Sequence, residues 1–152
     1  MAKTPNKPNS RVLEALKNHP EKIQIDFGGK RDFLLCAYGA KVLRERGHDP
    51  IPVVLDALRG LAPVFGNLDG KKKDGMKIIA SLIGSVDPKL LSDICYVIWW
   101  GLVSYDADIT LDEVEVYATP KSLYKVVEEV YGQMSSFASD EEEATAGGES
   151  GN

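Results

Sequence analysis

Along this chain, apolar residues alternate with polar ones in one short stretch near the start and recur at helical spacing through most of the rest. From Ile23 to Phe27 every second side chain is apolar, which is the period of a strand with one buried face. Gly28 and Gly29 can supply the positive φ angles of a tight turn, and the sequence RDFLL returns as the partner strand. The pattern predicts a β-hairpin over about residues 22–35, which needs a cover for its apolar face.

In the remaining chain, apolar residues recur every three or four positions, the period of an amphipathic helix. A short helix is expected to follow a Ser10 cap, and another to end at Gly47. Later helices should begin at Pro50, Pro88, Leu111 (after a Thr110–Glu113 capping box) and Pro120, and a further apolar segment spans residues 76–84. The expected fold class is α+β and mostly α-helical, with the N-terminal hairpin packed on a bundle of about five or six helices.

Composition divides the chain into three parts. Residues 1–20 are expected to form a flexible N-terminal extension with a short helix, and residues 21–137 a single globular domain, because 152 residues suffice for one hydrophobic core. Residues 138–152 contain no Lys or Arg but five acidic residues, so they are expected to form a disordered acidic tail. These five account for the formal net charge of -5, so the rest is close to neutral, which argues against a nucleic-acid surface.

The most apolar segment covers residues 95–105 and contains the adjacent Trp99 and Trp100. It is bounded by Asp93 and Asp106, at about half the length that a membrane-spanning helix needs. The opening sequence MAKTPNKPNS also lacks the apolar core of a secretory signal. We therefore expect a buried helix and no association with a membrane.

Asp106 and Asp108 follow this segment in the sequence DADIT, which matches the nucleophile motif of haloacid-dehalogenase-type phosphatases. That chemistry requires a strand before the motif and a large body with a second acidic pair after it, whereas here one helix and the acidic tail follow. An EF-hand loop is excluded because Leu111 stands at the glycine position and Tyr117 at that of the bidentate glutamate. We interpret the aspartates as the end of one helix and Thr110 as the cap of the next, so no metal site is predicted.

Other candidate groups lack the neighbours that catalysis needs. His19 and His48 lie at helix boundaries, without an acid or base partner visible in the sequence. Cys36 and Cys95 lie in apolar segments without metal-type spacing, as expected for free buried thiols, and Lys71–Lys73 is expected to be a solvated loop. No catalytic, cofactor-binding or metal-binding residue is predicted, and the protein is not expected to be an enzyme.

What remains is apolar surface that could bind another protein. The tryptophan helix carries apolar or aromatic side chains almost all round, so one flank is expected to be covered by a second polypeptide. The final helix has an apolar seam with tyrosines beside it, and large aromatic residues are favoured interface anchors. The predicted partner-binding residues are Trp99, Trp100, Tyr105, Tyr124, Val127, Tyr131, Met134 and Phe137.

The order of these features resembles the tail assembly chaperones of long-tailed bacteriophages. The likeness lies in the hairpin sequence IQIDFGGKRDFLLCAYGAKVL and in IWWGLVSYDADITLDEV, where an aromatic-Gly-Leu helix end precedes a Thr-capped acidic segment. A closing amphipathic helix and an acidic C-terminus complete it, and it covers roughly Ile23 to Phe137. The chain departs from the family pattern in its heavy Trp99-Trp100 pair and in its longer segments before residue 20 and over residues 66–75.

The resemblance implies an assembly factor. Such chaperones coat the tape measure protein, keep its apolar helical surface in solution and recruit tail tube subunits, acting in the host cytoplasm and leaving the mature virion. Many are made in two forms by a programmed ribosomal frameshift, and this chain would correspond to the short form, with self-association as a further expectation. The alternatives are a tail completion or connector subunit of the virion, a small magnesium-dependent phosphatase using Asp106 and Asp108, and an adaptor for a host protein.

Overall fold

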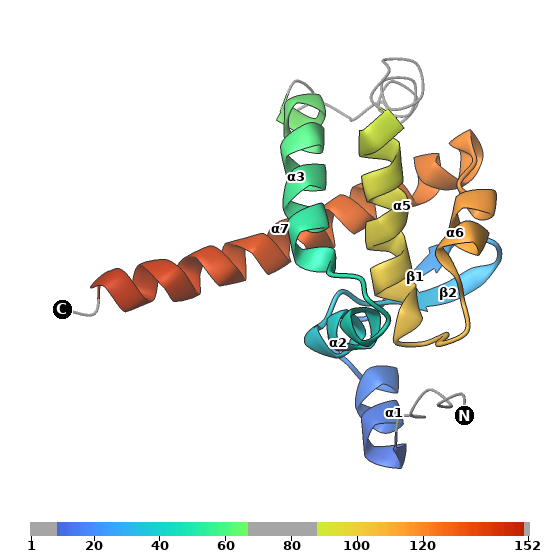
Figure 1. Cartoon of the computed structure of the whole chain (residues 1–152), viewed down its shortest axis with the longest axis horizontal. Helices are drawn as coiled ribbons and strands as arrows, with labels where there is room; N and C mark the ends of the chain where they lie inside the picture. The colour runs from blue at the N-terminus through green and yellow to red at the C-terminus, as the bar shows by residue number, and fades with distance from the viewer. Residues whose placement is uncertain (1–8, 67–87, 151–152) are drawn as a thin grey trace.

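The computed structural model describes residues 9–66 and 88–150, and places helices around one central helix with a small sheet at one side (Figure 1). In chain order the elements are α1 (Ser10–Lys17), β1 (Ile23–Asp26), β2 (Lys30–Phe33), α2 (Ala37–Glu45), α3 (Pro50–Gly66), α5 (Pro88–Val103), α6 (Leu111–Tyr117) and α7 (Pro120–Ser150). The predicted fold class, mostly helical with an N-terminal hairpin, is confirmed. The apolar segment of residues 76–84 lies outside the described residues.

The hairpin forms where the alternation of apolar residues predicts it. β1 and β2 pair antiparallel, with Ile23 opposite Phe33 and Asp26 opposite Lys30. The turn needs glycine because φ is 68° at Gly28 and 99° at Gly29, in the left-handed region that other residues rarely adopt. The alternating side chains of the hairpin turn into the core and anchor it to the helices.

Two helix starts illustrate how local capping operates. At α6 the predicted capping box is present: Thr110 Oγ1 accepts from the Glu113 N–H at 3.2 Å, and Glu113 Oε2 accepts from the Thr110 N–H at 3.4 Å. At α1 the cap is Asn9, whose Oδ1 accepts from the Val12 N–H at 2.9 Å, and Ser10 is the first helical residue. The prediction of a Ser10 cap was wrong by one position, because Asn and Ser have nearly equal preference for the cap.

The central helix α5, yellow in Figure 1, packs against α2, α3, α6 and β2. It runs antiparallel to α3, while α7 crosses behind both and contacts α3 and β1. Ten of its residues are buried, so nearly all of its circumference is covered. The core of the protein therefore lies around α5.

The closing helix α7 extends further than the sequence predicted. It is continuous from Pro120 to Ser150, and its C-terminal part projects away from the other elements (Figure 1). This differs from the disordered acidic tail expected for residues 138–152. The physical reason is that Glu and Ala favour helices, and each residue added to an existing helix gains a backbone hydrogen bond without a new nucleation step.

Candidate functional site

The tryptophan pair, predicted to bind a partner, lies in the core of this chain. Trp99 is 5% exposed and Trp100 is 0% exposed. The indole N–H of Trp99 donates to the carbonyl oxygen of Ile109 at 2.9 Å, and that of Trp100 to the carbonyl oxygen of Cys36 at 3.0 Å. The prediction that a second polypeptide covers these two residues is corrected: segments distant in the sequence cover them. No helix within residues 9–66 and 88–150 has the length and apolar character to cross a membrane.

The predicted partner-binding residues of α7 differ in how far they are buried. Val127 and Met134 are 2% and 1% exposed, so these two predicted partner-binding residues belong to the core of the chain itself. Tyr131 is half-buried against the core. The side chains of Tyr124 and Phe137 lie outside what the structure describes. The seam of α7 therefore packs inward, and a partner must use another face of the helix.

Tyr105, also predicted to bind a partner, is half-buried and holds α1 in place. Its hydroxyl donates to the carbonyl oxygen of Leu16 at 2.7 Å. Burial raises the pKa of Tyr105 to about 12, and the negative potentials of Cys36 and Asp32 add to the effect. The tyrosine thus tethers the N-terminal helix to the end of α5 in its neutral form.

The aspartates that match the phosphatase motif organise a loop. Asp106 Oδ2 accepts from Arg31 Nη1 at 3.3 Å, and Asp106 Oδ1 accepts from the Asp108 N–H at 3.3 Å. Arg31 lies over the ring of Tyr117, with its Cζ 5.2 Å from the ring centroid. In the described part of the chain, no group of three or more His, Cys, Asp or Glu side chains is placed to hold a metal ion. Asp106 therefore links the loop after α5 to the hairpin.

A cleft of about 470 Å³ lies between α7 and the segments that flank the hairpin. This volume is within the range of protein ligand sites. Its lining combines apolar residues, of which Leu34 and Leu35 are buried and Ile23 is half-buried, with exposed polar residues such as Glu21 and Glu129. The lining residues are His19, Glu21, Ile23, Leu34, Leu35, Cys36, Glu129, Gly132, Gln133 and Ser136.

Gln133 builds the cleft by joining α7 to both ends of the hairpin. Its Oε1 accepts from the Leu35 N–H at 2.9 Å, and its Nε2 donates to the carbonyl oxygen of Glu21 at 2.8 Å. One side-chain amide thereby satisfies a donor after β2 and an acceptor before β1. Through these two bonds Gln133 fixes the segments on either side of the hairpin against α7, and both segments line the cleft.

The α7 wall consists of Glu129, Gly132, Gln133 and Ser136, which share one face because they are three, one and three residues apart. This face was not predicted from the sequence, because the predicted partner-binding residues were the apolar and aromatic positions of the helix. A signal was present: an isolated glycine within a helical pattern weakens the helix and usually has a packing or functional reason. A Cβ added at Gly132 would meet nothing within 4 Å, so the fold itself does not require this glycine.

His19 and Cys36 also line the cleft, and the side chains of both make contacts within the fold. His19 Nδ1 accepts from the Glu21 N–H at 3.1 Å, which turns the chain from α1 into β1. The Cys36 thiol lies 3.6 Å from the Ser104 hydroxyl oxygen. Cys95 lies in the core instead, where burial raises the pKa of its thiol to about 11 and Glu115 adds to the shift. Alkylation of the Cys36 thiol therefore reports access to the cleft, while the buried Cys95 thiol is protected from the reagent.

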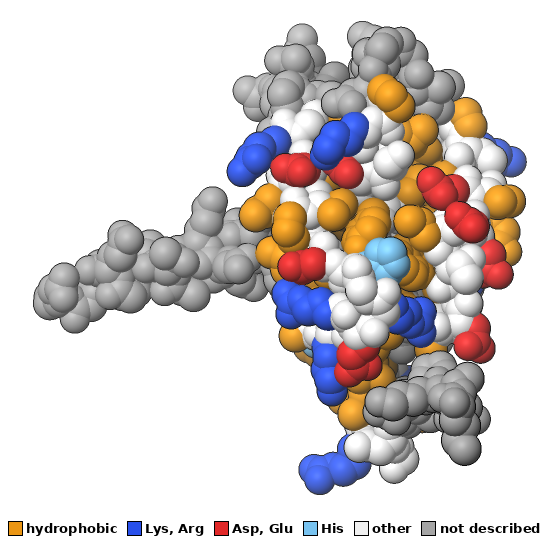
Figure 2. Space-filling model, in the orientation of Figure 1, with side chains coloured by type: hydrophobic (Ala, Val, Ile, Leu, Met, Phe, Trp, Pro, Cys, Tyr) orange, Lys and Arg blue, Asp and Glu red, His pale blue; other side chains and the backbone are white. Residues whose placement is uncertain are grey.

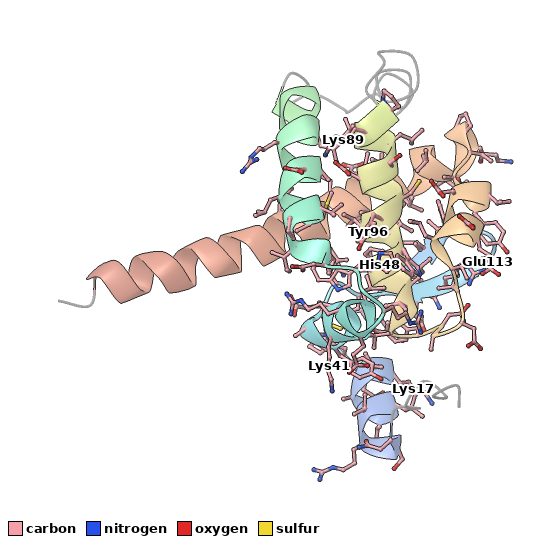
Figure 3. All side chains as sticks on the ribbon, viewed as in Figure 1. Lys17, Lys41, His48, Lys89, Tyr96 and Glu113 are labelled. Atoms are coloured by element: carbon pink, nitrogen blue, oxygen red, sulfur yellow. The ribbon has the colours of Figure 1, made fainter. Side chains whose placement is uncertain are left out.

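A second group of aromatic residues closes the corner between α2 and α3. The rings of His48 and Trp99 are 5.1 Å apart, those of Tyr96 and Trp99 5.7 Å, and Figure 3 shows His48 beside Tyr96 on the front of α5. Burial raises the pKa of Tyr96, and the charge of Asp49 raises it further. Figure 2 shows hydrophobic side chains along this face. Lys89, labelled above Tyr96 in Figure 3, lies 2.8 Å from Asp93 and 3.3 Å from Asp56 of α3. These contacts hold the α2–α3 connection on α5.

Comparison with protein-family models, with curated proteins and with solved structures found no match to this chain. The cleft between α7 and the segments that flank the hairpin is the candidate functional site.

Proposed function

We propose that the protein is a tail assembly chaperone of a long-tailed bacteriophage, which binds apolar helical segments of the tape measure protein and recruits tail tube subunits in the host cytoplasm. The observation that carries the proposal is the cleft between α7 and the hairpin. The hairpin and the closing helix are two of the elements in which the sequence resembles this family. The proposal thus joins the resemblance to a surface with a shape suited to binding.

The chemistry of the cleft suits a polypeptide partner. Among its lining residues, Ile23 and Cys36 are half-buried and offer apolar area to a hydrophobic side chain, while Leu34 and Leu35 are buried. Its rim carries Glu21, Glu129 and other polar groups that can fix the register of a bound segment. A chaperone for an apolar helical client needs this combination, because the client must be covered and later released to the tube subunits.

The phosphatase alternative receives no support from the arrangement of its aspartates. The carboxylate of Asp106 has both oxygens engaged, one by Arg31 and the other by the Asp108 backbone. These contacts of Asp106 support a structural role in the loop after α5.

The direct test is co-expression with the tape measure protein and measurement of the soluble fraction. The Ser136→Arg variant places a bulky cation on the exposed cleft wall, and the client should then precipitate. Ser92→Arg is the matched control, because Ser92 is exposed on α5 and does not line the cleft. Both variants should retain the circular dichroism spectrum of the native chain. A client that remains equally soluble with Ser136→Arg would exclude the cleft as the client site.

The structural-subunit alternative is separated by mass spectrometry of purified particles. A chaperone acts before the tail is complete, so its peptides should be missing from mature virions and present in the lysate. Stoichiometric recovery from the virion would instead identify a tail completion or connector subunit. This measurement does not depend on the location of the client site.

A further inference from the structure

Gly132 lies on the α7 wall of the cleft, where the fold gives no reason for a glycine. A Cβ at this position would meet nothing within 4 Å, and the backbone is not among the described positive-φ glycines. Glycine is the least favourable residue in a helix interior after proline. Ser136 lies one turn further along the same wall, so a bare strip of helix surface faces the cleft. A second helix can approach α7 closely only over such a strip, because interaxial distance depends on the side chains at the contact.

The charges at the cleft indicate the chemistry of that second helix. Glu21 and Glu129 line the cleft from different segments, and both are exposed. Within residues 9–66 and 88–150, neither forms an ion pair. The neighbouring lysines pair elsewhere, Lys22 with Asp32 at 3.8 Å and Lys125 with Asp26 at 3.2 Å. The cleft therefore presents two uncompensated carboxylates beside the half-buried Ile23 and Cys36, which is complementary to a cation flanking an apolar surface.

We propose that the cleft binds an amphipathic α-helix with Lys or Arg beside its apolar face, which packs over Gly132 and places a cationic side chain between Glu21 and Glu129. The inference rests on the proposed chaperone function and specifies the client segment that the cleft selects. The apolar side chains of this helix contact Ile23 and Cys36, the half-buried apolar residues that line the cleft. The basic side chain determines which apolar helices bind, because an acidic one in its place would meet two like charges.

The test measures binding of a synthetic amphipathic peptide, with one apolar face flanked by lysines, to the full-length protein by fluorescence anisotropy. Two matched peptides serve as comparisons: one carries glutamates in place of the lysines, and one carries prolines that prevent a helix. The lysine peptide should bind and slow the alkylation of Cys36. Absence of binding by the lysine peptide, or equal binding by either comparison peptide, would overturn the proposal.

Gly132→Leu tests the close approach of the helix. Leucine favours a helix more than glycine does, so the melting temperature should not fall. The added side chain blocks the strip, so peptide affinity should fall about tenfold or more. Loss of binding with unchanged or raised stability separates a blocked site from a damaged fold. Unchanged affinity would show that the peptide does not pack over α7 here.

The double variant Glu21→Gln/Glu129→Gln tests the charge complementarity. Its affinity for the lysine peptide should fall, and the salt dependence of binding should weaken. Glu14→Gln/Glu45→Gln is the matched control, because it changes the net charge equally at exposed positions outside the cleft. Equal losses in the two double variants would mean that net charge alone attracts the peptide, and the proposal would be wrong.

These results are distinguishable from a failure of the proposed function. If the peptide binds as described but the tape measure protein is not kept in solution, the chaperone assignment fails and the cleft specificity remains. If the tape measure protein is kept in solution but the lysine peptide does not bind, the assignment stands and the proposed client chemistry is wrong.

Discussion

The ring of Phe33 lies directly against the backbone of Gly101. A Cβ added at Gly101 would fall 2.0 Å from Phe33 Cε2, which is too close for any side chain. This approach also brings the Leu34 N–H within 3.0 Å of the Gly101 carbonyl oxygen, to which it donates. The glycine in the sequence IWWGL thus allows the hairpin to dock on the central helix.

Gly101→Ala should therefore destabilise the protein by about 1–3 kcal/mol, because the added methyl overpacks the core against Phe33. Urea unfolding measures the loss. Gly132→Ala is the matched control, since it replaces a helical glycine with open space around it and should gain up to about 1 kcal/mol. If the two variants had the same free energy of unfolding, the close contact between Phe33 and Gly101 would not affect stability.

Gln133→Ala should weaken the attachment of the hairpin to α7. The substitution removes the acceptor of the Leu35 N–H and the donor to Glu21 O, at a cost of about 1–3 kcal/mol. Hydrogen exchange should accelerate at the Leu35 amide. Gln24→Ala serves as the control because its exposed amide makes only a 3.5 Å contact with Asp32, and its effect should stay within about 0.5 kcal/mol. Unchanged protection of the Leu35 amide in Gln133→Ala would contradict this role.

Stability should fall at high pH through Tyr105. Its folded pKa is raised from 10.0 to about 12, so the folded state retains the proton more strongly than the unfolded state. The contribution is complete below pH of about 10 and is lost as the pH rises toward about 12. Urea unfolding across this range, with tyrosinate absorbance, measures the effect. Tyr105→Phe should reduce the slope and also lose about 1 kcal/mol at neutral pH, because the bond to Leu16 is removed.

Thr110→Ala should cost about 1 kcal/mol, because the N–H of Glu113 loses its capping acceptor. Thermal unfolding followed by circular dichroism measures the change. Thr110→Ser retains the hydroxyl and should recover most of the stability. Equal loss in the alanine and serine variants would mean that the threonine methyl, rather than the cap, is responsible.

Much of the local structure could be predicted from the sequence. The alternation over Ile23–Phe27 with Gly28 and Gly29 predicted the hairpin, and the spacing of Thr110 and Glu113 predicted the start of α6. These features depend on residues a few positions apart, whose turn angles and capping bonds are encoded locally. The same locality explains the small error at Asn9, where two adjacent residues compete as the cap.

The candidate site could not be predicted in this way. Trp99 and Trp100 were expected to face a partner, but the sequence alone does not show which distant segments cover a helix that is apolar all round. Gln133 appeared as an ordinary polar position until the fold placed it beside Leu35 and Glu21, 98 and 112 residues away in the chain.

By itself, the sequence determined the element types, the turn and the caps, because short-range hydrogen bonds and φ preferences act within a few residues. Only the tertiary structure decided which apolar faces are sealed and which polar side chains surround the cleft. Burial is a property of the packed elements together, and it depends on contacts between residues that are far apart along the chain.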